Sequence, residues 1–327
     1  MGDVVLLADP KSMVWEFSKS IQKYISTKYY GTENSDEFPL NPIEVKHFRN
    51  KEFIPHVQCN VRRKEIYFVQ DSTLDPSFWL TELILLKDLL LSASAERVNY
   101  VLPNLLWSRQ DRKDKPHVPI SSRAIAEAIS PNLSRIITMD LHAGQIQGDY
   151  PAEVPVDNLH SFPVAVNYLL EYHPKELESL VIASPDSGGV SRIKSFSKQL
   201  SKRTGRNYPL AFINKYRKDD GEPEVIDIVG DVNKKNVLII DDMIDSGGTM
   251  IEGVKGLKER GAKKVMGYGT HGLFTEGYDK VVKSLDAVIT SNTHHITDPR
   301  IEIIHVEDLF AEAIYRDYKG KSISELF

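Results

Sequence analysis

The residues best suited to chemistry lie between Val237 and Met250, where a buried strand is expected to run into a polar turn. Four apolar β-formers at 237–240 favour a strand covered on both faces. The turn that follows, here called the acid–glycine loop, contains Asp241, Asp242, Asp245, Ser246, Gly247, Gly248 and Thr249. From Met250 the apolar spacing becomes helical, and Gly261 is placed to end that helix. A strand, a tight loop and a helix N-terminus in this order present backbone N–H groups that suit a phosphate.

The two adjacent carboxylates indicate more than a phosphate site. Asp241 and Asp242 would repel a bare anion, whereas neighbouring hydroxyls of a sugar would satisfy them. We therefore expect a sugar phosphate, with residues 246–249 on the phosphate and the two aspartates on ribose hydroxyls. The plainer alternative is a βα turn that only caps a helix, and two acids directly after the strand speak against it. The loop resembles the phosphoribosyl pyrophosphate signature of the type I phosphoribosyltransferase fold, and it lacks the Walker and dinucleotide patterns.

The length and composition limit the classes of protein to which this chain can belong. The chain has 327 residues, 41% hydrophobic and 27% charged, which suits two globular domains. Its formal net charge of -5 argues against a general nucleic-acid binder. A single cysteine, Cys59, excludes an intrachain disulfide and favours a cytoplasmic location. The most apolar long stretch, 79–91, contains Glu82, Lys87 and Asp88, so we expect an amphipathic core helix and no membrane partner.

Strand-like and helix-like segments alternate along the chain, which predicts an α/β fold with two tandem doubly wound parallel sheets. The expected strands are 4–7, 44–48, 65–70, 98–102, 135–139, 180–183, 210–214, 237–240, 264–270, 287–290 and 301–305, with another beginning at Val225. The expected helices in the first half are 12–25, 80–91 and 122–129. The halves resemble divergent copies, because 135–139 runs into an Asp-containing loop as 237–240 does. We expect domains 1–155 and 156–327, with the C-terminal tail packing back on the first.

Other polar clusters follow expected strands. Its spacing alone predicts that the basic run 108–116 is a solvated loop. The run follows the expected strand 98–102, however, so Arg109 and Gln110 could contact a phosphate or the adenine edge of a nucleotide. Phe48, Asn50 and Glu52 alternate as on a strand edge and could hold a flat purine. A second Asp-Ser-Gly-Gly loop, 184–190, offers Asp186 to a hard cation. His142 has a structural alternative, since a lone histidine is more often a hydrogen-bonded group and imidazole is not a favoured magnesium ligand.

Together these stretches resemble the ribose-phosphate pyrophosphokinase (phosphoribosyl pyrophosphate synthetase) family over nearly the whole chain. The segments that carry the resemblance are 48–52, 108–113, 140–148, 155–159, 184–189, 215–217, 237–250 and the tail 309–327. The resemblance implies transfer of the β,γ-diphosphoryl group of ATP to the anomeric hydroxyl of ribose 5-phosphate, for nucleotide biosynthesis. It also implies Mg²⁺ as cofactor and a homo-oligomer built from dimers that stack into hexamers.

The roles implied by the resemblance divide into four groups. ATP would be bound by Phe48, Asn50, Glu52, Arg109, Gln110 and Asp111; Mg²⁺ by His142 and Asp186; ribose 5-phosphate by Asp241, Asp242, Asp245, Ser246, Gly247, Gly248 and Thr249; and catalysis would fall to Lys215 and Arg217. The charged loop 214–224 is by itself typical of a solvated hairpin. Its root at a strand end instead predicts a lid that closes over ATP, with both cations neutralising the transferring group.

Some positions depart from the family pattern. Trp107 and Ser108 replace a common Tyr-Ala, His117 and Val118 replace an Arg-Glu pair, Arg63 replaces a glycine, and the segment 28–41 is longer. In the family these regions lie near subunit contacts and the regulatory site, so we expect weaker phosphate activation and ADP inhibition.

Two other functions fit the sequence less well. A phosphoribosyltransferase needs one sugar-phosphate domain and a base-binding hood, which the tandem layout contradicts. A non-catalytic regulatory homologue would be expected to lose catalytic side chains that this chain retains.

Overall fold

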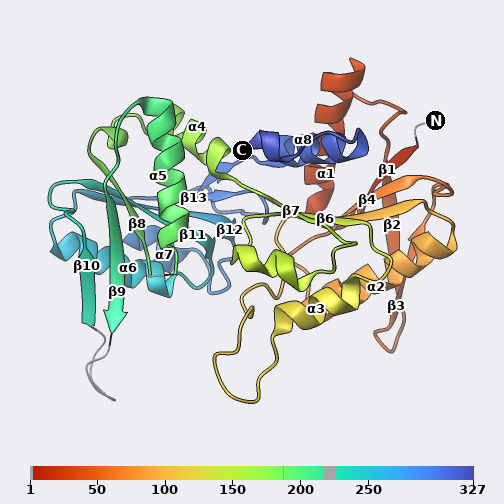
Figure 1. The fold of residues 1–327 in the computed structure, drawn as a ribbon, viewed down its shortest axis with the longest axis horizontal. Helices are drawn as coiled ribbons and strands as arrows, with labels where there is room; N and C mark the ends of the chain where they lie inside the picture. Colours follow the sequence, from red (N-terminus) through yellow and green to blue (C-terminus); the bar gives the residue numbers. More distant parts are fainter. Residues whose placement is uncertain (1–2, 187, 217–224) are drawn as a thin grey trace. The chain divides into compact units, whose positions relative to one another are not determined.

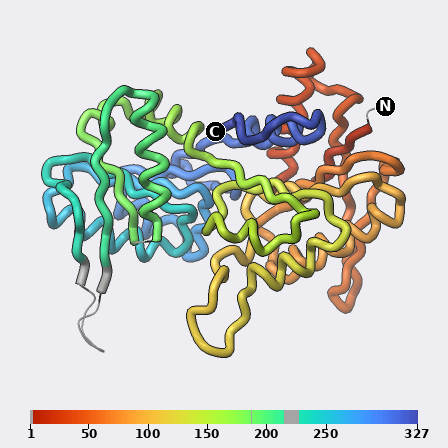
Figure 2. The backbone as a smooth tube through the Cα atoms, in the orientation of Figure 1, coloured from red at the N-terminus to blue at the C-terminus, as the bar shows by residue number. Residues whose placement is uncertain are grey.

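The computed structural model describes residues 3–186, 188–216 and 225–327. The chain divides into two compact units, one made of Met1–His160 with Val306–Phe327 and the other of Ser161–His305. Within each unit, helices cover both faces of a central sheet (Figure 1). The trace of the chain shows the last helix returning to the unit where the chain began (Figure 2). The domain bounds expected from the sequence, 1–155 and 156–327, remain a prediction.

The first unit is built on a seven-stranded sheet with the order β3-β2-β1-β4-β5-β6-β7. Neighbouring strands are parallel except in the antiparallel β2–β3 hairpin. The strands are β1 Val4–Ala8, β2 Leu40–His47, β3 Phe53–Val57, β4 Glu65–Val69, β5 Arg97–Leu102, β6 Arg135–Met139 and β7 Val156–Leu159. The α-helices are α1 Val14–Ile25, α2 Pro76–Ser92, α3 Ser121–Ile129 and α8 Glu307–Tyr318; a π turn, Ser26–Tyr30, and 3-10 turns, Gly144–Asp149 and Ser324–Leu326, complete the unit.

The second unit repeats this plan with the order β10-β9-β8-β11-β12-β13-β14. Only the β9–β10 pair is antiparallel among the strand pairs described. The strands are β8 Leu180–Ser184, β9 Leu210–Tyr216, β10 Val225–Val229, β11 Asn236–Ile244, β12 Lys264–Gly272, β13 Ala287–Ser291 and β14 Glu302–Ile304. The helices are α4 Phe162–Tyr172, α5 Val190–Thr204, α6 Gly248–Glu259 and α7 Asp279–Ser284, with a 3-10 turn at Glu176–Ser179.

The shared strand order confirms the expected fold of two doubly wound α/β sheets and the internal repeat in topology. The pairing of the copies was predicted wrongly. Counted from the hairpin edge, β11 is the fourth strand of its sheet and so is equivalent to β4, whereas β6 is equivalent to β13. The apolar pattern could not distinguish these strands, because every interior strand of a parallel sheet is covered on both faces.

Two strands were not expected from the sequence. The edge strand β3 contains Pro55 and has exposed residues at Ile54 and His56, so it lacks a clear apolar pattern. Proline is tolerated at this position because an edge strand leaves one row of N–H groups unpaired. The short strand β7 begins at Val156, the first residue of the expected second domain, where no strand is expected.

The helix α2 is more deeply buried than its charged residues suggested. Glu82 is 2% exposed and Lys87 is 7% exposed. Glu82 accepts a hydrogen bond from Gln70 Nε2 at 2.9 Å, and Lys87 Nζ donates one to the Ile129 carbonyl at 2.7 Å. Burial raises the pKa of Glu82 to about 7. Buried charged groups are tolerated where such partners exist. Within the described part of the chain, no helix is both long and apolar enough to cross a membrane.

The C-terminal helix α8 packs against α1 within the first unit (Figure 1). The Phe17 and Phe310 rings meet edge to face with centroids 5.5 Å apart. The Tyr29 and Tyr315 rings stack at 3.5 Å, and the Tyr29 hydroxyl donates to Glu312 Oε1 at 2.7 Å. The segment 28–41, which is longer than is usual in the family, therefore contacts α8 near its first residues.

Replacing Phe310 should destabilise the first unit. Phe310 is fully buried at 0% exposure, so Phe310→Ala should cost about 3–5 kcal/mol through lost burial and a cavity. Phe327→Ala is the matched control, because Phe327 is 41% exposed and its loss should change stability by less than about 0.5 kcal/mol. Urea unfolding of the full chain measures both, and equal effects of the two variants would contradict the packing described for α8.

Candidate functional site

The acid–glycine loop begins inside β11, not after it. The strand was expected to end at residue 240, but its pairing with β12 continues through Asp241 opposite Gly269 to Ile244 opposite Gly272. Asp242 is 1% exposed, while Asp241 is only partly buried. The prediction of an abrupt strand end is therefore wrong, because tertiary pairing with β12 extends the ladder into the polar residues.

The turn after β11 has the geometry expected of an anion site. Gly247 lies in the left-handed region at φ +76°, and a Cβ there would collide with Val281, so only glycine suits this position. The helix α6 begins at Gly248, earlier than the expected Met250, and Gly261 at φ +84° follows its end as expected. Residues 248 and 249, at the start of α6, are exposed, and the Gly248 N–H donates to Ser246 Oγ at 3.5 Å. A helix N-terminus at an exposed turn is a common site for a phosphate.

Arg192 is the residue of this site that was missed from the sequence. Its Nη1 lies 3.1 Å from Asp241 Oδ1, and its Nη2 lies 3.1 Å from Asp242 Oδ1. It belongs to the first turn of α5, the helix that follows β8, and β8 pairs with β11. The available signal was a basic residue three positions after the second Gly-Gly pair, at the start of a helix.

The environment of Asp241, including the neighbouring Asp242, raises the pKa of its carboxyl. Burial raises the pKa of Asp241 to about 8, and hydrogen bonding to Asp242 and repulsion from it act in the same direction. The Arg192 guanidinium opposes this shift by lowering the pKa of Asp241. The Asp241 carboxyl therefore keeps its proton to a higher pH than an exposed aspartate does.

The second predicted loop, 184–189, is closed by its own hydrogen bonds. The Ser184 hydroxyl donates to the Asp186 carbonyl at 2.6 Å, and the Gly189 N–H donates to Asp186 Oδ1 at 3.0 Å. Asp186 is exposed and lies four residues before Val190, the first residue of α5. Ser187 lies outside the described residues.

In the first unit, the predicted purine-binding residues lie in a turn. Residues 48–52 connect β2 to β3, with the Phe48 N–H bonded to the Glu52 carbonyl at 2.7 Å and the Glu52 N–H bonded to Asn50 Oδ1 at 3.2 Å. The expected strand 44–48 corresponds to β2, which begins earlier, at Leu40, and ends at His47, before Phe48. Phe48 is 47% exposed, so its ring is accessible to a flat ligand.

The other predicted ATP residues lie after β5. The Gln110 carbonyl accepts the Ser122 N–H at 3.2 Å at the start of α3. Asp111 Oδ2 accepts from Gln145 Nε2 at 2.9 Å, which brings this loop to the segment that contains His142. Arg109 and His142 are exposed.

Of the predicted catalytic pair, Lys215 lies in β9 with its backbone opposite Ile226 of β10. Arg217 and most of the predicted lid, residues 217–224, lie outside the described residues.

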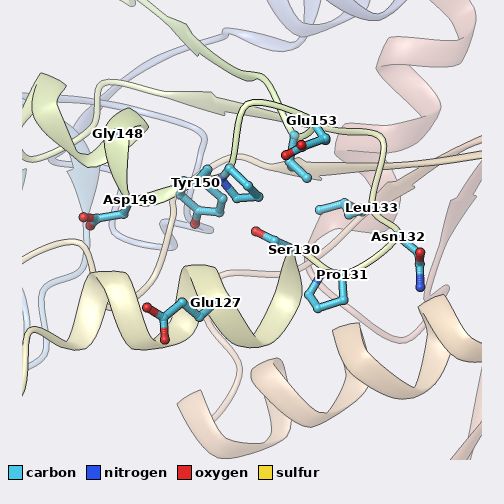
Figure 3. A pocket seen from close by; sticks show the side chains of 11 residues that line it. Glu127, Ser130, Pro131, Asn132, Leu133, Gly148, Asp149, Tyr150 and Glu153 are labelled. Atoms are coloured by element: carbon cyan, nitrogen blue, oxygen red, sulfur yellow. The ribbon is translucent and has the colours of Figure 1, made fainter.

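A cavity of about 690 Å³ in the first unit is separate from these positions. Its lining residues are Glu127, Ser130, Pro131, Asn132, Leu133, Gly148, Asp149, Tyr150, Pro151, Glu153 and Val154. Glu127 lies on α3, and Tyr150 lies on the segment that faces it (Figure 3). None of the predicted substrate residues lines this cavity.

Comparison with known proteins supports the expected family. Residues 12–131 match the N-terminal domain of ribose phosphate pyrophosphokinase, and residues 209–327 match the phosphoribosyl synthetase-associated domain. The chain is 34% identical to a ribose-phosphate pyrophosphokinase of Campylobacter jejuni, covering 95% of this chain and 96% of that protein. It is 36% identical, with the same coverage, to one of Wolinella succinogenes.

A solved structure agrees with the fold. Phosphoribosylpyrophosphate synthetase from Mycobacterium smegmatis superposes with a TM-score of 0.84 at 28% identity, covering 97% of this chain and 99% of that one. This similarity confirms the fold expected from the phosphoribosyltransferase-like loop.

Replacing Asp241 should change how stability depends on pH. Its folded-state pKa of about 8 exceeds the unfolded value of about 3.9, so the wild type loses stability as pH rises from about 4 towards 8. Asp241→Asn has no proton to lose there, so its melting temperature relative to wild type should increase between pH 5 and pH 8. Melting curves without substrate measure this, with the exposed Asp231→Asn as control. A difference independent of pH would contradict the raised pKa.

Proposed function

The chain belongs to the ribose-phosphate pyrophosphokinase family, and on that premise we propose that it makes phosphoribosyl pyrophosphate from ATP and ribose 5-phosphate. The anomeric oxygen of ribose 5-phosphate attacks the β-phosphorus of ATP. The bond between the β-phosphorus and the bridging oxygen of the α-phosphate breaks, AMP leaves, and the sugar hydroxyl loses its proton. The product serves nucleotide biosynthesis.

The observation that carries this proposal is the arrangement at the end of β11. One short segment offers two carboxyl groups, a glycine turn and the N-terminus of α6. Asp241 and Asp242 accept hydrogen bonds from the ribose hydroxyls. Asp245 supports the turn by accepting from the Thr275 hydroxyl, and Ser246, Gly247, Gly248 and Thr249 hold the 5-phosphate.

ATP is assigned to the first unit. The exposed Phe48 ring stacks on the adenine, and Asn50 and Glu52 bond to its edge or to the ribose. Arg109 contacts the phosphates, while Gln110 and Asp111 hold the loop in place through α3 and Gln145.

A divalent metal suits the chemistry, since both substrates carry several negative charges. Asp186 fits Mg²⁺ because it offers an exposed carboxylate, the ligand that this ion prefers. His142 is exposed but offers a nitrogen donor, so it is the weaker of the two predicted ligands. When bound, the ion neutralises phosphate charge and orients the transferring group.

Lys215 and Arg217 are assigned to the transferring group, with the loop that follows as a lid over ATP. Positioned cations stabilise charge that develops in phosphoryl transfer. We further propose that the protein acts in the cytoplasm as a homo-oligomer assembled from dimers into hexamers.

Product analysis tests the function directly. Purified protein incubated with ATP, Mg²⁺ and ribose 5-phosphate should form AMP and phosphoribosyl pyrophosphate in equal amounts, measured by ³¹P NMR. The control is the same reaction without ribose 5-phosphate, in which no AMP should form. Formation of ADP would indicate transfer of a single phosphoryl group and would overturn the proposal.

Replacing Lys215 should reduce the rate of transfer without removing the sugar site. Lys215→Ala should lower kcat by about 10²-fold or more, because one charge-stabilising cation is lost. Affinity for ribose 5-phosphate, measured by calorimetry without ATP, should change little, since the acid–glycine loop is a different segment. Lys202→Ala, on α5, is the matched control. An unchanged kcat with weakened substrate affinity would show that Lys215 only tethers substrate.

A further inference from the structure

Arg192 joins two carboxyl groups that the proposed function assigns to ribose. Its two terminal nitrogens each lie 3.1 Å from a different aspartate, Asp241 and Asp242. The Arg192 side chain is 17% exposed and the Asp242 side chain 2%, so both groups are shielded from water. Shielded charge pairs with this two-point geometry are stronger and more directional than surface ion pairs.

The position of Arg192 is unfavourable unless these acids are present. It lies in the first turn of α5, where the helix dipole favours negative side chains and disfavours cations. That turn contains no acidic residue of its own to compensate. The acids at the end of β11 therefore supply the compensation, and they are brought there because β8 and β11 are paired neighbours.

The first unit shows what replaces this contact when the acid pair is absent. The helix α1 follows β1 as α5 follows β8, and its third residue is Glu16, where α5 has Arg192. The strand β4, equivalent to β11, runs into Gln70 and Asp71. Asp71 Oδ2 accepts the Met13 N–H at 2.8 Å, a backbone donor beside the start of α1. The copy that lacks the Asp-Asp pair thus also lacks the arginine.

We propose that Arg192 is a positioning residue that orients Asp241 and Asp242 and balances their charge, so that both accept hydrogen bonds from neighbouring hydroxyls of ribose 5-phosphate. Asp241 Oδ1 receives Arg192 Nη1 and also the Asp242 N–H at 2.9 Å, so two donors fix one oxygen of this carboxyl. Without the guanidinium, two adjacent shielded acids share a proton more strongly. A carboxyl that holds a proton has lost part of its acceptor capacity. The identity of the sugar rests on the proposed function.

Binding of ribose 5-phosphate to the full chain tests this role without turnover. Arg192→Gln keeps N–H donors but removes the charge, and it should weaken binding by about 10- to 100-fold in calorimetry without ATP. In the complete assay KM for ribose 5-phosphate should rise while kcat at saturation stays within about threefold. Arg192→Lys should recover part of the affinity. Arg203→Gln is the matched control, since Arg203 lies in the last turn of α5 and contacts Asn167.

A second measurement separates positioning from a general effect on folding. If Arg192 acts through Asp241, Arg192→Gln should weaken binding much less in an Asp241→Asn background than in the wild type. The preference for ribose 5-phosphate over 2-deoxyribose 5-phosphate should also shrink in Arg192→Gln. Melting curves establish whether each variant is folded. If Arg192→Gln does not fold, the same comparison is made with Arg192→Lys, alone and combined with Asp241→Asn.

The proposal is overturned if Arg192→Gln binds ribose 5-phosphate as tightly as Arg203→Gln does, or if the two substitutions weaken binding additively. Failure of the proposed function gives a different result. Wild-type protein would then form no AMP, or would not bind ribose 5-phosphate at all. An active wild type with an unaffected Arg192→Gln refutes only the role of the arginine.

Discussion

Two carboxyl groups in consecutive positions at the end of β11 impose the constraint on which the second unit depends. Asp242 is buried and Asp241 adjoins it, so their charges repel in a place where water screens them poorly. A guanidinium between them relieves the repulsion, and Arg192 supplies it from the first turn of α5. The contact links the end of one strand to the helix that follows its neighbour, so both loops at this edge of the sheet are held by a single ion cluster.

The repeated topology provides the same edge in the first unit, but with different chemistry. There the equivalent strand end carries Asp71, which is occupied by backbone and side-chain donors of its own unit. The residues assigned to ATP lie instead in the turn after β2 and in the loop after β5. One arrangement of strands thus carries different loop chemistry in its two copies, because the loops at strand ends vary while the apolar strands that position them do not.

Buried charged residues of the first unit have hydrogen-bond partners. Glu82 and Lys87 are buried, and each bonds to a group from another segment. Asp317 of the returning helix accepts the buried Tyr67 hydroxyl at 2.7 Å. These contacts specify how α2 and α8 lie on the sheet, since an apolar surface alone allows many orientations and a hydrogen bond allows few.

The sequence by itself determined the two tandem α/β layers, the phosphate-suited turn and the assignment to a family, because apolar periodicity and a glycine loop are properties of neighbouring residues. Only the tertiary structure decided that β11 continues through Asp241, that Phe48 lies in a hairpin turn and that α1 is the helix on which the expected C-terminal return packs. It also decided the partner of Arg192, which is 49 positions from Asp241 in the chain. Each of these depends on contacts between distant segments, and local residue patterns contain no information about which segments meet.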